Sequence, residues 1–186
     1  MYNFKKAFEL TVGHEGGYGN DKRDRGNWTT GVIGEGELKG TKYGVSAMSY
    51  PDLDIENLTL EQAEKIYTRD YWDKLRGTQL PDGVDVFLFD YAVNSGVSRS
   101  AISLQRMVGA ADDGHIGPQT LKLVEERYPS ADKSKTQKLL GQLYANREYF
   151  YKQLSTFDIY GKGWLRRNDD IYNASAKLIK YGVMKP

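Results

Sequence analysis

The feature that most constrains the fold of this chain is an amphipathic segment over residues 3–14 that runs into two adjacent glycines. The residues of its buried stripe recur at helical spacing, which predicts a helix with one face in the core. Glycine adopts the left-handed conformation that ends helices, so Gly16 and Gly17 predict the stop. Glu15 is therefore expected at the C-terminal end of this helix. The stripe consists of Phe4, Ala7, Phe8, Thr11 and Val12.

Two effects are expected to raise the pKa of the Glu15 carboxyl. The negative end of the helix dipole disfavours a carboxylate there, and burial beside Tyr18 or Trp28 would act in the same direction. A general acid that works near neutral pH needs such a raised pKa. The alternative interpretation is a surface glutamate that merely precedes a helix stop.

A second carboxyl, Asp24, lies nine positions after Glu15 in a stretch rich in turn-forming residues, and Thr29 and Thr30 follow it. An inverting glycosidase holds two carboxyls roughly 6.5–9.5 Å apart, so that a water fits between them. Glu15 and Asp24 facing each other across a groove, with a threonine hydroxyl near the water, would provide that arrangement. Asp24 could also simply close an Asx-turn, which we would favour if Glu15 were absent.

Residues 28–33 and 41–45 predict a small β-ribbon with irregular loops. Adjacent residues of an extended ribbon point to opposite faces. Only one of Thr29 and Thr30 is therefore expected to enter a cleft. Glu35 and Glu37 lie in a turn between the two halves of the ribbon, where charged side chains are usually just solvated.

Several motifs of the N-terminal half resemble the signature of glycoside hydrolase family 108, whose members are N-acetylmuramidases found as phage endolysins and in related bacterial proteins. The spacing of glutamate, aspartate and threonine is also similar to that of phage-type lysozymes. Compared with many family members, this chain has Gly26-Asn27 in place of two glycines, and it inserts residues 32–40. The matching motifs are Glu15-Gly-Gly-Tyr18, Asn20-Asp21, Asp24-x-Gly26-Asn27-Trp28-Thr29 and Gly40-Thr41-Lys42-Tyr43-Gly44-Val45.

The resemblance implies a lysozyme-like α+β fold that is mostly α-helical, with a small β-ribbon lobe packed on a helical lobe around a central buried helix. It implies cleavage of the β-1,4 bond between N-acetylmuramic acid and N-acetylglucosamine in peptidoglycan. Glu15 falls on the catalytic glutamate of the family and Asp24 on its loop aspartate. Thr29 fits the spacing of family 108, and Thr30 fits the spacing of phage lysozymes.

The resemblance extends along most of the chain. Residues 89–96 resemble the central buried helix of the family, and residues 113–121 resemble its C-terminal peptidoglycan-binding-type segment. We therefore expect a catalytic region over 1–96 with its β-ribbon lobe at 16–50, and a helical region over 97–186 packed into the same globular body. Local signals predict further helix boundaries: a capping box at Thr59 to Gln62, stops at Gly96 and Gly109, a cap at Ser98, and a first turn at Pro118.

Sugar-binding clefts use aromatic faces, and Tyr18, Trp28 and Tyr43 are the candidates for substrate contact. Asn94 is a fourth candidate on the predicted central helix. Because Asp90 lies one helical turn before it, the alternative is a structural hydrogen-bonded pair that holds the lobes together.

Composition excludes several classes of function. The net charge of +1 gives no strong electrostatic footprint for nucleic acid or membrane. There is no cysteine, and His14 and His115 are the only histidines, so neither a zinc site nor another metal or cofactor is expected. The N-terminal residues do not resemble a signal peptide. We expect a monomer made in the bacterial cytoplasm that reaches the cell wall through a phage holin or a dedicated secretion system.

Three functions are compatible with these residues. A muramidase hydrolyses with water, for which Asp24 and the threonines are suited. A lytic transglycosylase also needs a glutamate, but it forms a 1,6-anhydro sugar and needs no aspartate to hold water. A non-catalytic wall-binding or scaffold protein would have a degenerate site, against which the presence of Glu15, Asp24 and both threonines argues.

Overall fold

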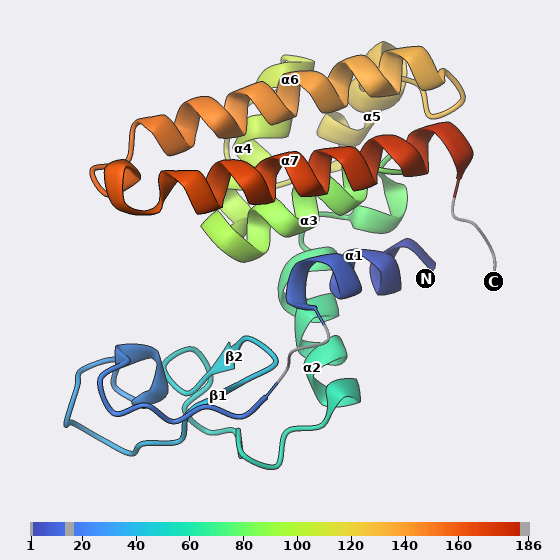
Figure 1. Ribbon diagram of the computed structural model, residues 1–186. Helices are drawn as coiled ribbons and strands as arrows, with labels where there is room; N and C mark the ends of the chain where they lie inside the picture. Colours follow the sequence, from blue (N-terminus) through green and yellow to red (C-terminus); the bar gives the residue numbers. More distant parts are fainter. Residues whose placement is uncertain (1, 14–16, 183–186) are drawn as a thin grey trace. The chain divides into compact units, whose positions relative to one another are not determined.

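The computed structural model describes residues 2–13 and 17–182, which contain seven α-helices and one two-stranded antiparallel sheet (Figure 1). This mostly helical α+β architecture confirms the predicted fold class. The strands are β1 (Thr41–Lys42) and β2 (Val45–Ser46), and short 3-10 or π turns form η1 (Arg25–Asn27), η2 (Thr68–Trp72) and η3 (Gly77–Gln79). The α-helices are α1 (Tyr2–Val12), α2 (Leu60–Tyr67), α3 (Val84–Ser95), α4 (Val97–Val108), α5 (Pro118–Arg127), α6 (Lys133–Lys152) and α7 (Phe157–Tyr181).

The chain forms two compact units. The first joins residues 1–11 to residues 69–186 and holds α1 and α3 to α7. The second comprises residues 12–68 and holds the sheet, η1 and α2. The division into regions 1–96 and 97–186 stays a prediction.

The helix α1 ends earlier than its apolar stripe suggested. It stops at Val12, and Gly13 follows with a φ of 73°, in the left-handed region that favours glycine. The prediction that the helix continues to residue 14 and is stopped by Gly16 and Gly17 is therefore wrong. His14, Glu15 and Gly16 lie outside the described residues.

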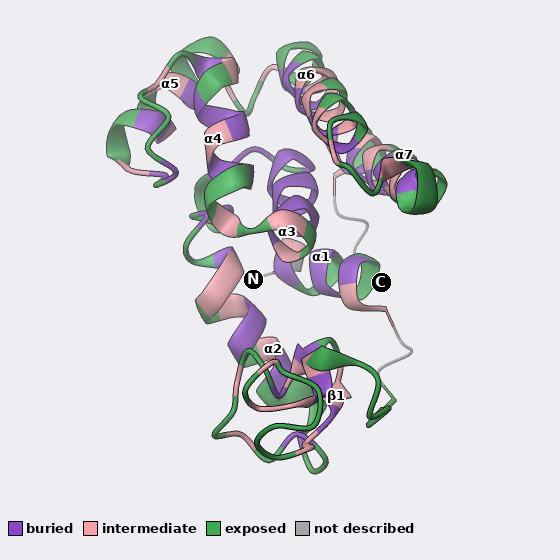
Figure 2. Ribbon diagram, turned by 90° about the vertical axis from the view of Figure 1, so that its left-hand side faces the viewer, coloured by how far each residue is buried: buried purple, intermediate pink, exposed green. Residues whose placement is uncertain are grey.

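The centre of the larger unit is α3, whose residues 84–92 are all buried (Figure 2). Apolar residues occur on every side of this helix, as enclosure by other helices requires, and its two buried charged residues are Asp85 and Asp90. It contacts α4, α6 and α7, and the long helices α6 and α7 run side by side (Figure 1). The predicted central buried helix is thus confirmed. No helix among the described residues combines the length and apolarity needed to cross a membrane.

A buried ion cluster joins α3 to both long helices. The carboxylate of Asp90, 1% exposed, lies 2.8 Å from Arg147 Nη2 and 2.6 Å from Arg167 Nη2. Arg147 is itself fully buried, with its guanidinium 4.8 Å from the centre of the Tyr91 ring. Asn94 donates to the backbone carbonyl of Asp90, at 2.8 Å. The predicted hydrogen bond between Asp90 and Asn94 is therefore present, but it uses the backbone carbonyl of Asp90, because two arginines take the carboxylate.

Most predicted helix boundaries are confirmed. Thr59 and Gln62 form the reciprocal capping box at the start of α2, and Gly96, Gly109 and Pro118 occupy the expected terminal positions. The cap at Ser98 is wrong. The chain turns at Gly96, whose φ of 95° and ψ of 145° let α4 begin directly at Val97 without a side-chain cap.

The predicted strand over residues 28–33 is wrong. Only Trp28 pairs, in an isolated bridge with Leu38, and residues 29–36 form turns. Gly31, Gly34 and Gly36 have φ values of 71°, 86° and 74°, which interrupt an extended backbone. The inserted residues 32–40 therefore form a looped excursion, and the true ribbon is limited to β1 and β2.

Candidate functional site

A buried asparagine organises the loops that carry the candidate residues. Asn27 is 3% exposed; its amide Nδ2 donates to the carbonyl oxygen of Asp21 at 3.0 Å, and its Oδ1 accepts from Thr41 Oγ1 at 2.7 Å. Its backbone carbonyl accepts from the amides of Lys39 and Gly40. One side chain thus joins the turn before η1 to β1. This organising role of Asn27 was not predicted from the sequence, because its partner Thr41 lies 14 positions away.

Asp24 starts η1 and lies at the surface. Its Oδ1 accepts from the amide of Gly26 at 2.8 Å, which is the Asx-turn considered as the alternative role. A Cβ at Gly26 would lie 3.2 Å from the same oxygen, so a side chain at residue 26 would crowd the carboxylate in this turn. Within residues 2–13 and 17–182 the carboxylate makes this one hydrogen bond. The turn therefore fixes one oxygen and leaves the carboxylate open to solvent.

The two threonine hydroxyls both bind the inserted loop. Thr29 Oγ1 accepts from the amide of Glu37 at 3.0 Å. Thr30 Oγ1 donates to the carbonyl of Glu35 at 2.8 Å and accepts from the amide of Val32 at 3.3 Å. The expectation of opposite faces on an extended ribbon does not apply, because these residues lie in turns. Thr29 still has a hydroxyl proton to donate to another group, whereas the Thr30 hydroxyl is engaged as both donor and acceptor.

Tyr18 borders a cavity of about 350 Å³ in the smaller unit. Gly19 and Thr41 exchange two backbone hydrogen bonds of 2.9 and 2.8 Å, which lay the Tyr18 ring against Gly40. A Cβ at Gly40, whose φ is 82°, would lie 2.6 Å from that ring. The absence of a side chain at residue 40 thus lets the ring line the cavity. The lining residues are Tyr18, Leu38, Lys39, Asp52, Leu53, Asp54, Ile55 and Glu56.

Two lysines fix the wall of this cavity that residues 52–56 form. Lys39 Nζ donates to the carbonyl of Pro51 at 2.8 Å, and Lys42 Nζ donates to the carbonyl of Glu56 at 2.7 Å. Hydrogen bonds from Asn57 lower the pKa of Asp54, and the two lysine charges act in the same direction with a smaller effect. The wall therefore presents a carboxylate that stays ionised in mildly acidic solution.

Tyr43 lies in the tight turn between β1 and β2. Tyr43 and Gly44 have φ values of 52° and 73°, the two positive values of a type I′ hairpin turn. A non-glycine residue there costs roughly 1–3 kcal/mol and persists only where its surroundings hold it. The hydroxyl of Tyr67 does so by donating to the Tyr43 carbonyl at 3.1 Å. Tyr67 was not predicted to support the site, because it lies on α2, 24 positions after Tyr43 in the sequence.

The remaining candidates separate into different places. Trp28 is half-buried, and its Nε1 donates to the carbonyl of Lys22 at 2.9 Å, which fixes the indole within the loop. Asn94 is exposed on α3 and belongs to the larger unit. Asp24, Trp28, Thr29 and Thr30 share one loop region of the smaller unit. Among the described residues, no group of three His, Cys, Asp or Glu side chains could hold a metal ion.

Comparisons with known proteins agree with this architecture. The model of the family described as Glycosyl hydrolase 108 matches residues 8–96, just under half of the chain, and supports a glycoside hydrolase. The chain is similar to the solved structure of Brucella abortus SagA, with 28% sequence identity, a TM-score of 0.74, and coverage of 98% of this chain and 97% of that one. No curated protein matches the chain. The family match ends at residue 96, so the peptidoglycan-binding-type segment at 113–121 stays a prediction.

Proposed function

We propose that this chain is an N-acetylmuramidase of glycoside hydrolase family 108, which hydrolyses the β-1,4 bond between N-acetylmuramic acid and N-acetylglucosamine in peptidoglycan. The observation that carries the proposal is the family match over residues 8–96, which contain Glu15, Asp24, Thr29 and Thr30 in the spacing that family 108 and phage lysozymes use. The similarity to SagA over nearly the whole of both chains supports one shared fold for the matched and unmatched halves.

In this proposal Glu15 protonates the leaving glycosidic oxygen. Asp24 orients the attacking water and stabilises positive charge that develops on the sugar. The exposed carboxylate of Asp24 supports this role, because the Gly26 amide anchors one oxygen while the group stays open to solvent. The hydroxyl proton of Thr29, which lies in the same loop region, supplies a further donor.

Saccharide contacts are proposed along the smaller unit. Tyr18 lines a cavity that is also lined by Lys39 and Asp54. This mixture of an aromatic surface with a few fixed polar groups is typical of ligand sites. Trp28 and Tyr43 are the further contacts that we propose in this unit, and Asn94 is one that we propose from the sequence in the larger unit.

A lytic transglycosylase is the second candidate. The observation that favours it is the use of Asp24 and both threonines as hydrogen-bonding partners within their own loops. A site in which these groups are purely structural would leave Glu15 as the single catalytic group and would form a 1,6-anhydro product without water.

Mass spectrometry of purified peptidoglycan after digestion separates these functions. A muramidase yields reducing N-acetylmuramic acid ends, a transglycosylase yields 1,6-anhydro ends, and a wall-binding or scaffold protein yields no new ends. Glu15→Gln serves as the matched control for contaminating activity. Reducing ends that vanish in the control support the proposal, and anhydro ends or intact glycan strands overturn it.

The biological setting that we propose follows from this activity. The partner is bacterial peptidoglycan, and the enzyme acts as a monomer on the cell wall after release from the cytoplasm in which it is made. Release would use a phage holin if the protein is a phage or prophage endolysin, or a dedicated secretion system. Bacteriolysis that requires co-expression of a holin would support the first route.

A further inference from the structure

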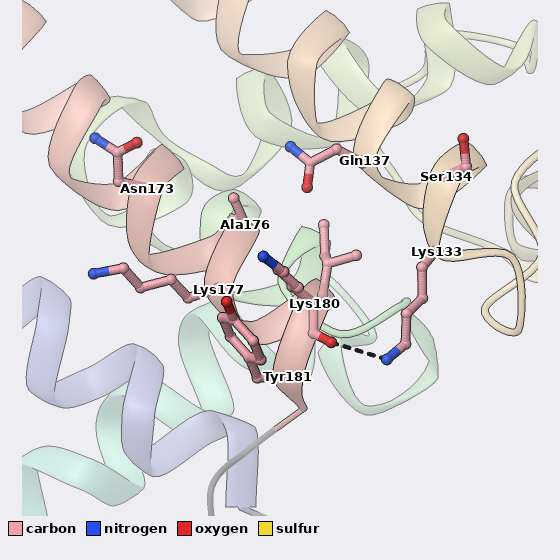
Figure 3. Close-up of a pocket in the computed structure, with 9 residues that line it drawn as sticks. Lys133, Ser134, Gln137, Asn173, Ala176, Lys177, Lys180 and Tyr181 are labelled. Atoms are coloured by element: carbon pink, nitrogen blue, oxygen red, sulfur yellow. Dashed lines mark hydrogen bonds between the residues drawn. The ribbon is translucent and has the colours of Figure 1, made fainter.

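A second cavity lies between the first turn of α6 and the last turns of α7, outside the region that the family model matches (Figure 3). Its volume of about 730 Å³ falls in the range of small-molecule binding sites. The proposed hydrolysis makes no use of it. Its lining consists of Lys133, Ser134, Gln137, Asn173, Ala176, Lys177, Ile179, Lys180 and Tyr181.

The lining contains three lysines and no acidic residue. None of these three ammonium groups forms an ion pair with a carboxylate in the described part of the chain. Some lysines on other helix surfaces do, as Lys65 pairs with Glu61 and Lys152 with Glu148 one turn away. For a protein with a net charge of only +1, this is a local and uncompensated positive cluster.

Carboxylates near the cavity are engaged elsewhere. Asp132, which precedes α6, accepts from the backbone amide of Lys135 at 3.0 Å and lies 3.9 Å from its ammonium group. One turn before Asn173 on α7, Asp169 accepts from the hydroxyl of Tyr144 at 2.6 Å. Neither carboxylate is among the residues that line the cavity.

Two of the lysines are held in place. Lys133 reaches from α6 and donates from Nζ to the carbonyl of Lys180 at 3.0 Å, as the dashed line in Figure 3 shows. Lys180 Nζ lies 4.9 Å from the centre of the Tyr181 ring. Each ammonium has three donors, so these contacts leave donors for a ligand. Ordering them beforehand lowers the entropy that binding would cost.

We infer that this cavity binds the phosphate groups of a phosphodiester-linked polyol chain. Lysine is a compact point charge that suits a phosphate oxygen. The amides of Gln137 and Asn173 can bond to polyol hydroxyls, and the exposed ring of Tyr181 offers a face to the carbon chain between phosphates. Of the two aliphatic lining residues, Ile179 is buried and Ala176 is half-buried with a single methyl group, so the cavity offers little aliphatic surface for insertion into a bilayer.

Binding to lipid-free poly(glycerol phosphate) chains tests this inference, measured by isothermal titration calorimetry with the full chain at low salt. The test variant carries Lys133→Gln, Lys177→Gln and Lys180→Gln. The matched control carries Lys5→Gln, Lys74→Gln and Lys162→Gln, three exposed lysines of the same unit with the same change in charge. Parallel titrations use inorganic phosphate and vesicles of phosphatidylglycerol in phosphatidylcholine.

We expect the test variant to bind the polymer about tenfold more weakly, since three exposed charge pairs between lysine and the phosphates of the polymer are lost. The control should bind within about twofold of wild type. The affinity should fall as salt is added. Equal weakening in both variants, binding of vesicles but not polymer, binding of inorganic phosphate alone, or no binding would each overturn the inference. Because the assay needs no hydrolysis, a failure of the proposed muramidase activity would leave its result unaffected.

Discussion

Arg167 joins the last turn of α1 to the buried carboxylate of Asp90. Its Nη2 donates to the carbonyl oxygen of Thr11 at 2.8 Å and to Asp90 Oδ1 at 2.6 Å, and its Nε donates to the same carboxylate oxygen at 3.0 Å. The three residues come from α7, α1 and α3. Glu15 follows Thr11 by four positions in the sequence, so this arginine anchors the end of α1 that precedes the proposed catalytic glutamate.

Replacement of Arg167 should therefore lower both stability and activity. Arg167→Ala leaves Asp90 with Arg147 alone and should reduce the free energy of unfolding by about 1–2 kcal/mol, less than for a fully buried pair because Arg167 is partly exposed. Arg167→Lys, which cannot bond both partners as a planar fork, should recover only part of each loss. Urea denaturation and peptidoglycan turnover measure the two effects. Arg166→Ala, an exposed neighbour, should change the free energy of unfolding by about 0.5 kcal/mol or less.

A loss of activity in Arg167→Ala at temperatures where it is fully folded would show that the arginine positions the chain. Full activity in the folded variant would limit Arg167 to a structural role.

Asp85 should make stability depend on pH. Burial raises the pKa of its carboxyl to about 7, and the nearby charge of Asp82 acts in the same direction, while hydrogen bonds from Asn3 and Val86 oppose the shift. A carboxyl with a raised pKa binds its proton more tightly in the folded state. The free energy of unfolding should then fall as pH rises from about 4 to 7, by at most about 1.4 kcal/mol per pH unit.

Asp85→Asn should remove this component. The difference in free energy of unfolding between wild type and variant, measured by urea denaturation at pH 4, 5.5 and 7, should change steadily in favour of the variant. A difference that stays constant across the three pH values would show that Asp85 titrates normally.

The two threonines should contribute unequally to activity. Thr29→Ala removes a hydroxyl whose proton is available for a ligand, whereas Thr30→Ala removes two hydrogen bonds within the inserted loop. We expect Thr29→Ala to lose catalysis without a large change in melting temperature. Thr30→Ala should lower the melting temperature and spare most of the turnover. Equal turnover in both variants would show that neither hydroxyl takes part in catalysis.

How far the sequence predicts this structure depends on the range of each interaction. The capping box at Thr59 and the glycine stop at Gly96 follow from a few neighbouring residues, and both are confirmed. The end of α1 was missed because Gly13, Gly16 and Gly17 lie close together, and local spacing does not indicate which of them ends the helix. The roles of Asn27 and Asp90 were missed because their partners, such as Thr41 and Arg167, are brought close only by the tertiary fold.

Asp24→Asn should be damaging, but less so than loss of the glutamate. An asparagine oxygen can still accept from the Gly26 amide, so the turn at η1 should survive and the melting temperature should stay close to that of wild type. The amide can still orient a water, but it cannot act as a base or stabilise positive charge on the sugar. Turnover of peptidoglycan at saturating substrate measures the loss. Wild-type turnover by Asp24→Asn would remove Asp24 from the mechanism and favour the single-glutamate transglycosylase.

Glu15 is proposed as the general acid of a glycoside hydrolase, and the turnover of peptidoglycan by Glu15→Gln tests this role most directly. Glutamine has nearly the same shape but cannot deliver a proton, so turnover should fall by at least the ~10²–10⁴-fold typical of acid–base catalysis. The melting temperature and circular dichroism spectrum should match those of wild type. Turnover close to wild type by the folded variant would contradict the assignment of Glu15 and, with it, the proposed mechanism.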